Sequence, residues 1–263
     1  MEIVILIKQV PNTTEVKIDP KTGNLIREGI DSIINPDDTH AIEAALRLKE
    51  AYGGRVTGIS MGPPQAIDAL SEAMAMGVDR AILLTDRPFA GADTWATSTT
   101  LGKAIEKLGN YDLVIAGRQA IDGDTAQIGP QVAEYLGIPH VSYVAGIESV
   151  DDGRITVKKA VEDGYQWLRM PLPSLITVIS EINNPRPFHL ARLLDACKEK
   201  APVEVWNVAD LNLKVNQVGL VGSLTQVIKT FSPKSKREIK MLSGDAKTQV
   251  RELLSELRQK RLI

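Results

Sequence analysis

The stretch DLVIAGRQAIDGDTAQIGP, residues 112–130, joins an apolar run to a loop rich in glycine and aspartate and then to the start of a helical pattern. The apolar run predicts a buried strand at Asp112–Ala116. The pattern after the loop predicts a helix near Gln127–Leu136, which Gly137 ends. A strand, a short loop and a helix form the repeating unit of a parallel sheet covered by helices, so this stretch indicates an α/β fold.

The same alternation runs through the first two thirds of the chain. Asn35-Pro36 predicts a helix start, because asparagine caps helices and proline fits the first turn, and Gly53-Gly54 predicts its end near Tyr52. A hairpin is expected from Val16–Asp19 and Leu25–Glu28 around a proline- and glycine-containing turn. The remaining strands are expected at Ile3–Lys8, Arg55–Ser60, Ala81–Thr85 and from His140, and the remaining helices at Pro63–Met76 and Thr94–Leu108.

The pattern changes after residue 146. Short alternating segments predict an antiparallel extension of the sheet at Ile147–Val150, Arg154–Val161, Tyr165–Met170 and Leu175–Ser180. A helix near Leu190–Lys198, an extended piece Pro202–Trp206 and a terminal helix at about Asp245–Lys260 follow. Leu253, Leu254 and Leu257 give the last helix an apolar stripe. We expect residues 1–200 to form the α/β domain and residues 201–263 to form an arm that docks on another chain, or alternatively returns to its own sheet.

Composition sets the class of protein. The chain has 263 residues, 43% hydrophobic and 24% charged, with a net charge of −2, which is ordinary for a globular protein. No apolar run reaches membrane-helix length, and the start has neither a basic region nor a cleavage site, so we expect a cytoplasmic protein without a membrane span. One cysteine, Cys197, and three separated histidines argue against a metal site. From Lys229 to the last residue there are ten basic and four acidic residues. This excess of positive charge favours an acidic partner or a solvated charged helix.

The loop at Gly117–Pro130 is the strongest candidate binding site. Its small residues let backbone N–H groups approach an anion, Thr125 and Gln127 offer side-chain donors, and the next helix points its positive end at the same place. Asp122 and Asp124 repel phosphate, so they would hold ribose hydroxyls, cap the helix or brace the loop. Ligands of open parallel sheets bind at the carboxyl ends of strands. The alternative is a capped connection without a ligand.

A second cradle is expected where Asp93 and Thr94 open a helix, with Thr97 one turn on. Two hydroxyl groups beside a helix N-terminus suit a further phosphate, unless Asp93 only caps. The usual G-x-G-x-x-G and G-x-x-x-x-G-K-[ST] phosphate loops are absent, as are catalytic Ser/His/Asp, Cys–His and H-E-x-x-H sets. No basic-plus-aromatic pattern points to nucleic acid.

Four motifs in this order resemble the beta subunit of electron-transferring flavoproteins over essentially the whole chain. They are KQVP (Lys8–Pro11), NPDD (Asn35–Asp38), GRQAIDGDTAQIGP (Gly117–Pro130) and EINNPRPFHLARLLDACK (Glu181–Lys198). The resemblance implies an α/β sheet with a C-terminal arm on the alpha subunit, whose own FAD is the redox-active one. It also implies a beta-site nucleotide, AMP in simple members and FAD in electron-bifurcating ones. Gly123 and Thr125 resemble the FAD-binding type, whereas Asp195-Ala196-Cys197 departs from the lysine-rich respiratory type.

The resemblance carries site residues over to this chain. It implies client docking through Pro185–Lys198, with Leu190 as apolar anchor. The cofactor-binding residues it implies are Lys8, Gln9, Val10, Pro11, Asn35, Ser60, Met61, Gly62, Asp93, Thr94, Thr97, Gly117, Gln119, Asp122, Gly123, Asp124, Thr125, Gln127 and Gly129.

These expectations describe an electron carrier with no catalytic residue of its own. A bifurcating complex would oxidise NADH and send electrons to ferredoxin or flavodoxin and to a client of the acyl-CoA dehydrogenase type. The near alternative is a non-bifurcating subunit with structural AMP. An adenylate-forming enzyme would need an S-G-G-x-D-S or H-I-G-H-like signature, which the sequence lacks, and a nucleotide-sensing module without redox chemistry would be colourless.

Overall fold

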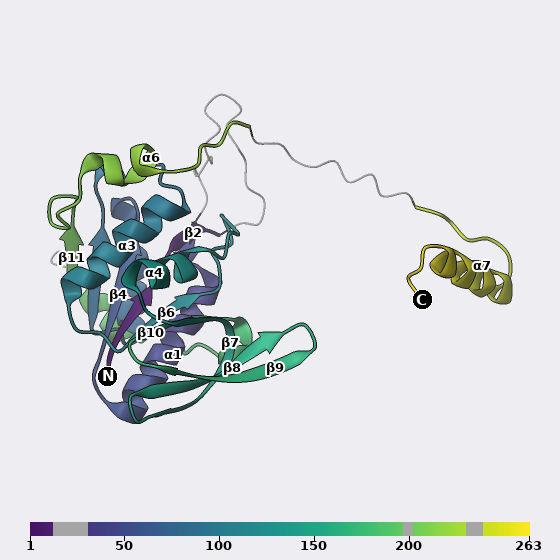
Figure 1. The fold of residues 1–263 in the computed structure, drawn as a ribbon, viewed down its shortest axis with the longest axis horizontal. Helices are drawn as coiled ribbons and strands as arrows, with labels where there is room; N and C mark the ends of the chain where they lie inside the picture. Colours follow the sequence, from purple (N-terminus) through teal and green to yellow (C-terminus); the bar gives the residue numbers. More distant parts are fainter. Residues whose placement is uncertain (13–30, 197–201, 230–238) are drawn as a thin grey trace. The chain divides into compact units, whose positions relative to one another are not determined.

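The computed structural model describes residues 1–12, 31–196, 202–229 and 239–263. The chain divides into two compact units, Met1–Val227 and Ile228–Ile263. The first unit is built on a nine-stranded sheet covered by helices (Figure 1). The predicted α/β class with a doubly wound sheet is confirmed.

Seven of the nine strands run parallel. Their order is β11-β5-β4-β1-β6-β10-β7, and β8 and β9 follow antiparallel at one edge. The strands are β1 (Glu2–Leu6), β4 (Arg55–Met61), β5 (Arg80–Leu84), β6 (Leu113–Gly117), β7 (His140–Asp151), β8 (Arg154–Val161), β9 (Gly164–Pro171), β10 (Ser174–Val178) and β11 (Val203–Trp206).

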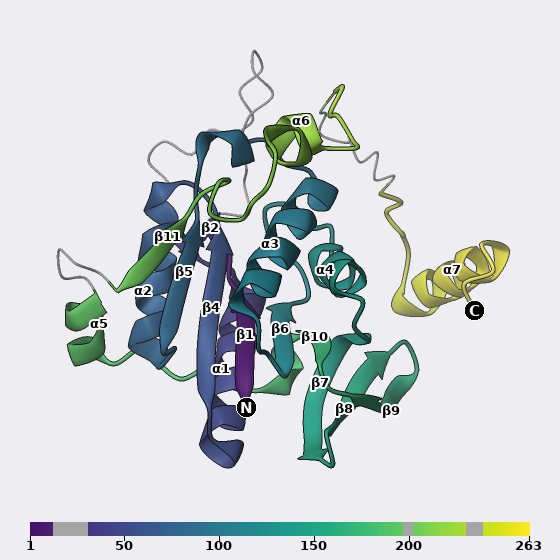
Figure 2. The same cartoon turned by 60° about the vertical axis from the view of Figure 1, so that its left-hand side comes forward.

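Alternate residues of the central strands are buried on opposite faces of the sheet. Ile3 and Ile5 of β1 pack with α1 (Pro36–Tyr52) and α2 (Ile67–Met76). Val4 and Leu6 pack on the other face with α3 (Thr94–Leu108) and α4 (Ile128–Leu136) (Figure 2). Strands buried on both faces read as continuous apolar runs, which is why their positions could be predicted.

The third quarter of the chain differs from expectation in one strand. The predicted antiparallel extension is confirmed for β8 and β9, and β7 continues without a break through Ile147–Val150 into their hairpin. The segment predicted at Leu175–Ser180 is not part of that extension. As β10, it inserts between β6 and β7 and runs parallel to both. A fully buried five-residue strand carries no signal of its direction, so the sequence could not reveal this placement.

Short elements connect the sheet to its surroundings. β2 (Gln9–Pro11) and β3 (Ser32–Ile34) form a separate antiparallel ribbon. The predicted hairpin Val16–Asp19 with Leu25–Glu28 lies outside the described residues. Single 3-10 turns occur at η1 (Pro64–Ala66), η2 (Arg87–Phe89), η3 (Ser180–Ile182) and η4 (Val215–Gln217), and two short helices at α5 (Leu190–Ala196) and α6 (Gly219–Gly222).

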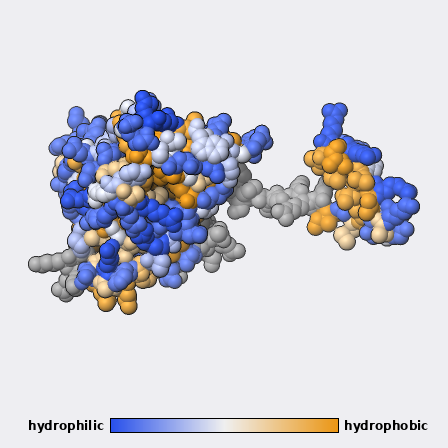
Figure 3. All heavy atoms as spheres, turned by 90° about the horizontal axis from the view of Figure 1, so that it is seen from below, coloured by the Kyte–Doolittle hydropathy of each residue, from blue (hydrophilic) through white to orange (hydrophobic). Residues whose placement is uncertain are grey.

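The expected boundary at residues 200 and 201 falls before β11, which pairs with β5 in the main sheet, and the first compact unit continues to Val227. The second unit contains α7 (Ala246–Gln259), which Asp245 caps by accepting a hydrogen bond from the Thr248 N–H at 2.9 Å. Apolar side chains gather along one side of this helix, as Figure 3 shows. Among the described helices, none is long and apolar enough to cross a membrane.

Candidate functional site

The strand order puts the switch point of the sheet at the carboxyl end of β1, and we call the opening expected there the crevice. The chain passes from β1 to β4 and β5 on one side and then crosses to β6 on the other side. At such a switch point the loops after the two central strands diverge to opposite faces and leave an opening between them. Lys8 follows β1 and Gly117 ends β6, so two of the segments named from the sequence flank the same opening.

A direct contact joins these two segments. Lys8 Nζ lies 2.6 Å from Asp122 Oδ1, and the Asp122 side chain is almost buried while that of Lys8 is half-exposed. Asp122 therefore braces the loop, one of the three roles that its sequence position allowed.

Asn35 and Asp38 lie underneath the loop and hold it in place. Asn35 Nδ2 donates to Gln119 O at 2.9 Å and to Asp38 Oδ1 at 3.1 Å, and Asn35 Oδ1 accepts from the Ile121 N–H at 3.1 Å. The side chain of Asn35 is fully buried. Its polar atoms are all used within the protein, so this predicted site residue supports the loop from below.

Asp38 is a site residue that the sequence prediction missed. Its Oδ2 accepts from the Lys8 N–H at 2.8 Å, and its Oδ1 accepts from the Gly117 N–H at 3.2 Å, so one carboxyl group ties together the ends of β1 and β6. A Cβ atom at Gly117 would collide with this carboxyl group, which explains the glycine. The signal available was a second acid in the first turn of a helix that faces a sheet.

Burial changes the protonation of Asp38. Removal from water raises its pKa to about 7, against the lowering effect of hydrogen bonds from Asn35, Lys8 and Gly117. A strongly perturbed carboxyl group at a crevice is a frequent property of functional sites.

The loop itself is held in an unusual backbone conformation. Asp124 and Ala126 have φ angles of 51° and 54°, in the left-handed region that non-glycine residues avoid. Asp124 accepts a hydrogen bond from Gln119 Nε2, and the Asp124 N–H donates to Ala120 O at 2.8 Å. A Cβ at Gly123 would meet nothing within 4 Å. The loop therefore presents open backbone at Gly123 on a rigid base, with Thr125 exposed beside it.

The two predicted cradles are neighbours. Thr94 Oγ1 at the start of α3 donates to Oε1 of Gln127, which precedes α4, at 3.0 Å. Gln131 Nε2 donates to Thr94 Oγ1 at 3.3 Å. The N-terminal ends of both helices thus meet at the crevice, and Thr97 lies half-buried one turn into α3. Gly129 allows α4 to pack on β10, because a Cβ there would collide with Thr177.

Asp93 caps α3, as one of the two sequence interpretations stated, by accepting from the Ala96 N–H at 2.9 Å. It also holds residues 223–225, which come from the far end of the first unit. The sequence gave no indication of this second role.

The remaining predicted residues line the other side of the opening. Ser60 at the end of β4 is fully buried, and its Oγ atom has no hydrogen-bond partner among the described residues. Met61 and Gly62 are half-buried, and Gln9 Nε2 donates to Gln65 O at 3.1 Å. Val10 and Pro11 are buried in the β2–β3 ribbon, so their side chains face the protein.

The donor chemistry of this crevice fits a ligand that carries phosphate groups. Two helix N-termini and the open backbone at Gly123 suit phosphate groups, and the unpaired Ser60 Oγ can bond a further polar group. Among the residues that the structure describes, no group of histidine, cysteine, aspartate and glutamate side chains could hold a metal ion.

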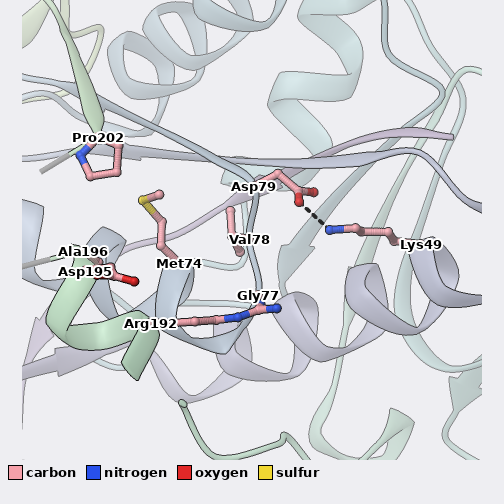
Figure 4. A pocket seen from close by; sticks show the side chains of 9 residues that line it. All are labelled: Lys49, Met74, Gly77, Val78, Asp79, Arg192, Asp195, Ala196 and Pro202. Atoms are coloured by element: carbon pink, nitrogen blue, oxygen red, sulfur yellow. Dashed lines mark hydrogen bonds and ion pairs between the residues drawn. The ribbon is translucent and has the colours of Figure 1, made fainter. Parts of the chain in front are cut away.

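Leu190 lies away from this crevice. It begins α5 and is 65% exposed. A pocket of about 320 Å³ lies beside the same helix. Its lining includes Arg192, Met74, Lys49 and Asp79, the last two of which are paired (Figure 4). The pocket lies at the amino ends of β5 and β11, whereas ligands of parallel sheets bind at carboxyl ends. We therefore take the crevice, and not this pocket, as the candidate site.

Fold and site together define a doubly wound α/β protein with a candidate ligand site at its switch point. The model of the electron transfer flavoprotein domain matches residues 22–211, and the chain belongs to this family. It is 50% identical to the electron transfer flavoprotein subunit beta of Thermoanaerobacterium thermosaccharolyticum, with both chains fully covered. It is 48% identical to the caffeyl-CoA reductase-Etf complex subunit CarD of Acetobacterium woodii, again over both whole chains. A third relative, the acryloyl-CoA reductase electron transfer subunit gamma of Anaerotignum propionicum, is 44% identical over its full length. The protein is an electron transfer flavoprotein subunit of the beta type.

Proposed function

We propose that this beta-type subunit binds FAD in the crevice between β1 and β6 and transfers electrons only within a heterodimer with an alpha subunit. The observation that carries the proposal is the loop after β6, which Asn35, Asp38 and Lys8 hold rigid while leaving Gly123 open. A rigid loop with open backbone is what close approach to a pyrophosphate requires.

The chain's residues would bind and orient the cofactor. Gly123, Thr125 and Gln127 would donate to phosphate oxygens beside α4, with Thr94 on the α3 side. Lys8, whose half-exposed side chain pairs with Asp122, would hold the loop at the rim. The isoalloxazine ring supplies the redox chemistry when FAD is bound, and the protein sets its position and surroundings.

We further propose that the complex takes part in electron bifurcation. NADH would be the donor, ferredoxin or flavodoxin the low-potential acceptor, and a dehydrogenase or reductase that acts on a CoA ester the other acceptor. Support comes from the glycine and threonine at positions 123 and 125 and from the likeness to subunits of caffeyl-CoA and acryloyl-CoA reductase complexes.

The nucleotide content of the purified heterodimer tests this function. We expect two FAD molecules per heterodimer after acid extraction and chromatography. One FAD with one AMP would overturn the FAD assignment and favour the non-bifurcating alternative. A heterodimer with neither nucleotide in the beta subunit would overturn the crevice as a binding site.

The second compact unit would dock on the alpha subunit. Val250, Leu253 and Leu254 of α7 are exposed apolar side chains on an otherwise charged helix, as expected of a helix that lacks its binding surface. Deleting residues 240–263 should weaken co-purification of the alpha subunit. Unchanged co-purification would contradict the docking role.

A further inference from the structure

The segment Gly219–Thr225 is fastened to the loop that precedes α3. The Leu220 N–H donates to Ala90 O at 2.9 Å. Gly219 has a φ of 57°, and a Cβ there would collide with Pro88 O. Only glycine allows so close an approach, so the segment is built to lie against this loop.

Asp93 holds the end of that segment. Its Oδ2 accepts three hydrogen bonds of 2.9 Å each, from the Leu224 N–H, the Thr225 N–H and the Thr225 hydroxyl. The Asp93 N–H donates to Ser223 Oγ at 2.8 Å. We name residues 223–225 the strap. Its donors converge on one carboxylate oxygen, while the other oxygen caps α3.

These donors change the electrostatics of the α3 N-terminus. Burial opposes ionisation of Asp93, but hydrogen bonds from Ala96, Thr225 and Leu224 outweigh it and hold the pKa of this carboxyl group below its ordinary value. A bare carboxylate at this place would repel a phosphate group. A carboxylate that already accepts four hydrogen bonds presents less negative charge to a neighbouring anion.

Asp93 also adjoins the nucleotide cradle. The next residue, Thr94, donates to Gln127 at the start of α4. Two consecutive residues at the start of α3 therefore make these contacts: Asp93 bonds the strap and Thr94 bonds Gln127 of the cradle.

We propose that Asp93 is a positioning residue that couples the nucleotide crevice to the strap, and so to the start of the chain's C-terminal segment. This inference rests on the proposed nucleotide binding. When an anion is bound, loss of the strap's hydrogen bonds to Asp93 requires more free energy, because the carboxylate would then repel the anion. Conversely, a strap that is hydrogen-bonded to Asp93 raises the affinity of the cradle for an anion. Such coupling is reciprocal, because two linked binding equilibria must shift each other equally.

Hydrogen exchange on the heterodimer tests the coupling, since the Leu224 and Thr225 amides are the donors. The beta site is emptied of nucleotide, and exchange in a peptide covering residues 219–227 is followed with and without added FAD. AMP is used in a parallel series. We expect bound nucleotide to slow exchange of this peptide about 5-fold or more in the wild type.

Two exposed substitutions give a matched pair. Thr225→Val removes the hydroxyl donor, so nucleotide affinity should fall about 3- to 10-fold and the slowing of exchange should shrink. Thr225→Ser keeps a hydroxyl and should behave as the wild type. If both variants bind nucleotide with equal affinity, and nucleotide does not change the rate of hydrogen exchange in the strap, the coupling is overturned while nucleotide binding stands. Failure of the wild type to bind either nucleotide overturns both proposals.

Discussion

Lys8 Nζ and Asp122 Oδ1 form an ion pair of 2.6 Å that spans the switch point of the sheet. Lys8 follows the central strand, and Asp122 belongs to a loop more than a hundred residues later. Because the Lys8 ammonium is half-exposed, the pair adds little to stability, on the order of 1 kcal/mol or less. We infer that it serves to fix the loop at the mouth of the crevice.

Asp122→Ala should therefore reduce nucleotide binding more than stability. The loop would lose its tie to β1, and the affinity of the beta site should fall about 10-fold, the equivalent of one lost charge-assisted hydrogen bond. The FAD of the alpha subunit should stay in place. Nucleotide analysis of the heterodimer measures both. Glu106→Gln is the control, because it breaks an exposed ion pair with Lys103 on α3, outside the loop. Equal loss of both nucleotides would mean that the heterodimer had fallen apart.

Gly123 in the loop after β6 and Gly129 in the first turn of α4 should respond differently to alanine. At Gly129 a Cβ would collide with Thr177 where α4 packs on β10, so Gly129→Ala should lower the free energy of unfolding by about 1–3 kcal/mol. At Gly123 a Cβ meets open space, so Gly123→Ala should leave stability unchanged. If phosphate approaches this open backbone, the same variant should bind nucleotide more weakly.

Urea denaturation and nucleotide titration of both variants separate these effects. A Gly123→Ala protein with full nucleotide affinity would show that the ligand does not contact this part of the loop.

Local patterns were sufficient to predict most of the fold. α1 and α3 begin and end where Asn35-Pro36, Gly53, Thr94 and Leu108 indicated, because proline and glycine act within one turn. The direction and place of β10 could not be predicted, since its pairing with β6 and β7 depends on contacts between segments far apart in the sequence. The pairing of β11 with β5 is likewise a contact between distant segments, so the sequence did not reveal it.

The sequence indicated which segments would meet at the candidate site, but not the hydrogen bonds that hold them there. Lys8, Thr94, Gln127 and the loop after β6 do converge, because carboxyl ends of parallel strands share one edge. The contacts that Asn35, Asp38 and Asp93 make with distant parts of the chain were not predicted. A hydrogen bond between residues 79 to 131 positions apart leaves no pattern in a sequence, whereas a cap or a turn does.

The raised pKa of Asp38 predicts a specific pH dependence. The carboxyl group titrates at about 7 when folded and at 3.8 in its ordinary state. Between these values the folded protein binds more protons than the unfolded chain, so stability falls as pH rises from about 4 to about 7 and levels off above. A difference of this size corresponds to about 4 kcal/mol at most.

Asp38→Asn should remove this dependence. The amide cannot accept as many hydrogen bonds from Lys8 and Gly117, so the variant should be less stable than the wild type at pH 5. At pH 8 the deficit should narrow by about 2–4 kcal/mol, because the wild type then carries a buried charge. Urea denaturation of both proteins at several pH values measures this difference in the free energy of unfolding. A gap that stays constant with pH would show that Asp38 titrates near its ordinary value.

Leu190 should matter for electron delivery and for nothing else in the isolated complex. It is 65% exposed at the start of α5, and α5 is held by its contact with α2 and by a hydrogen bond of 3.0 Å from the His189 N–H to Ala75 O. An exposed leucine on a fixed helix suits insertion into a pocket of a client protein. Leu190→Ala should therefore leave stability and flavin content unchanged and slow electron transfer to the client about 10-fold, chiefly through weaker binding. Stopped-flow reduction of the client at increasing concentrations separates binding from transfer.

Val161→Ala, at an exposed apolar position on β8, is the matched control and should have no effect. If Leu190→Ala and Val161→Ala transfer electrons equally well, the client docks on another surface.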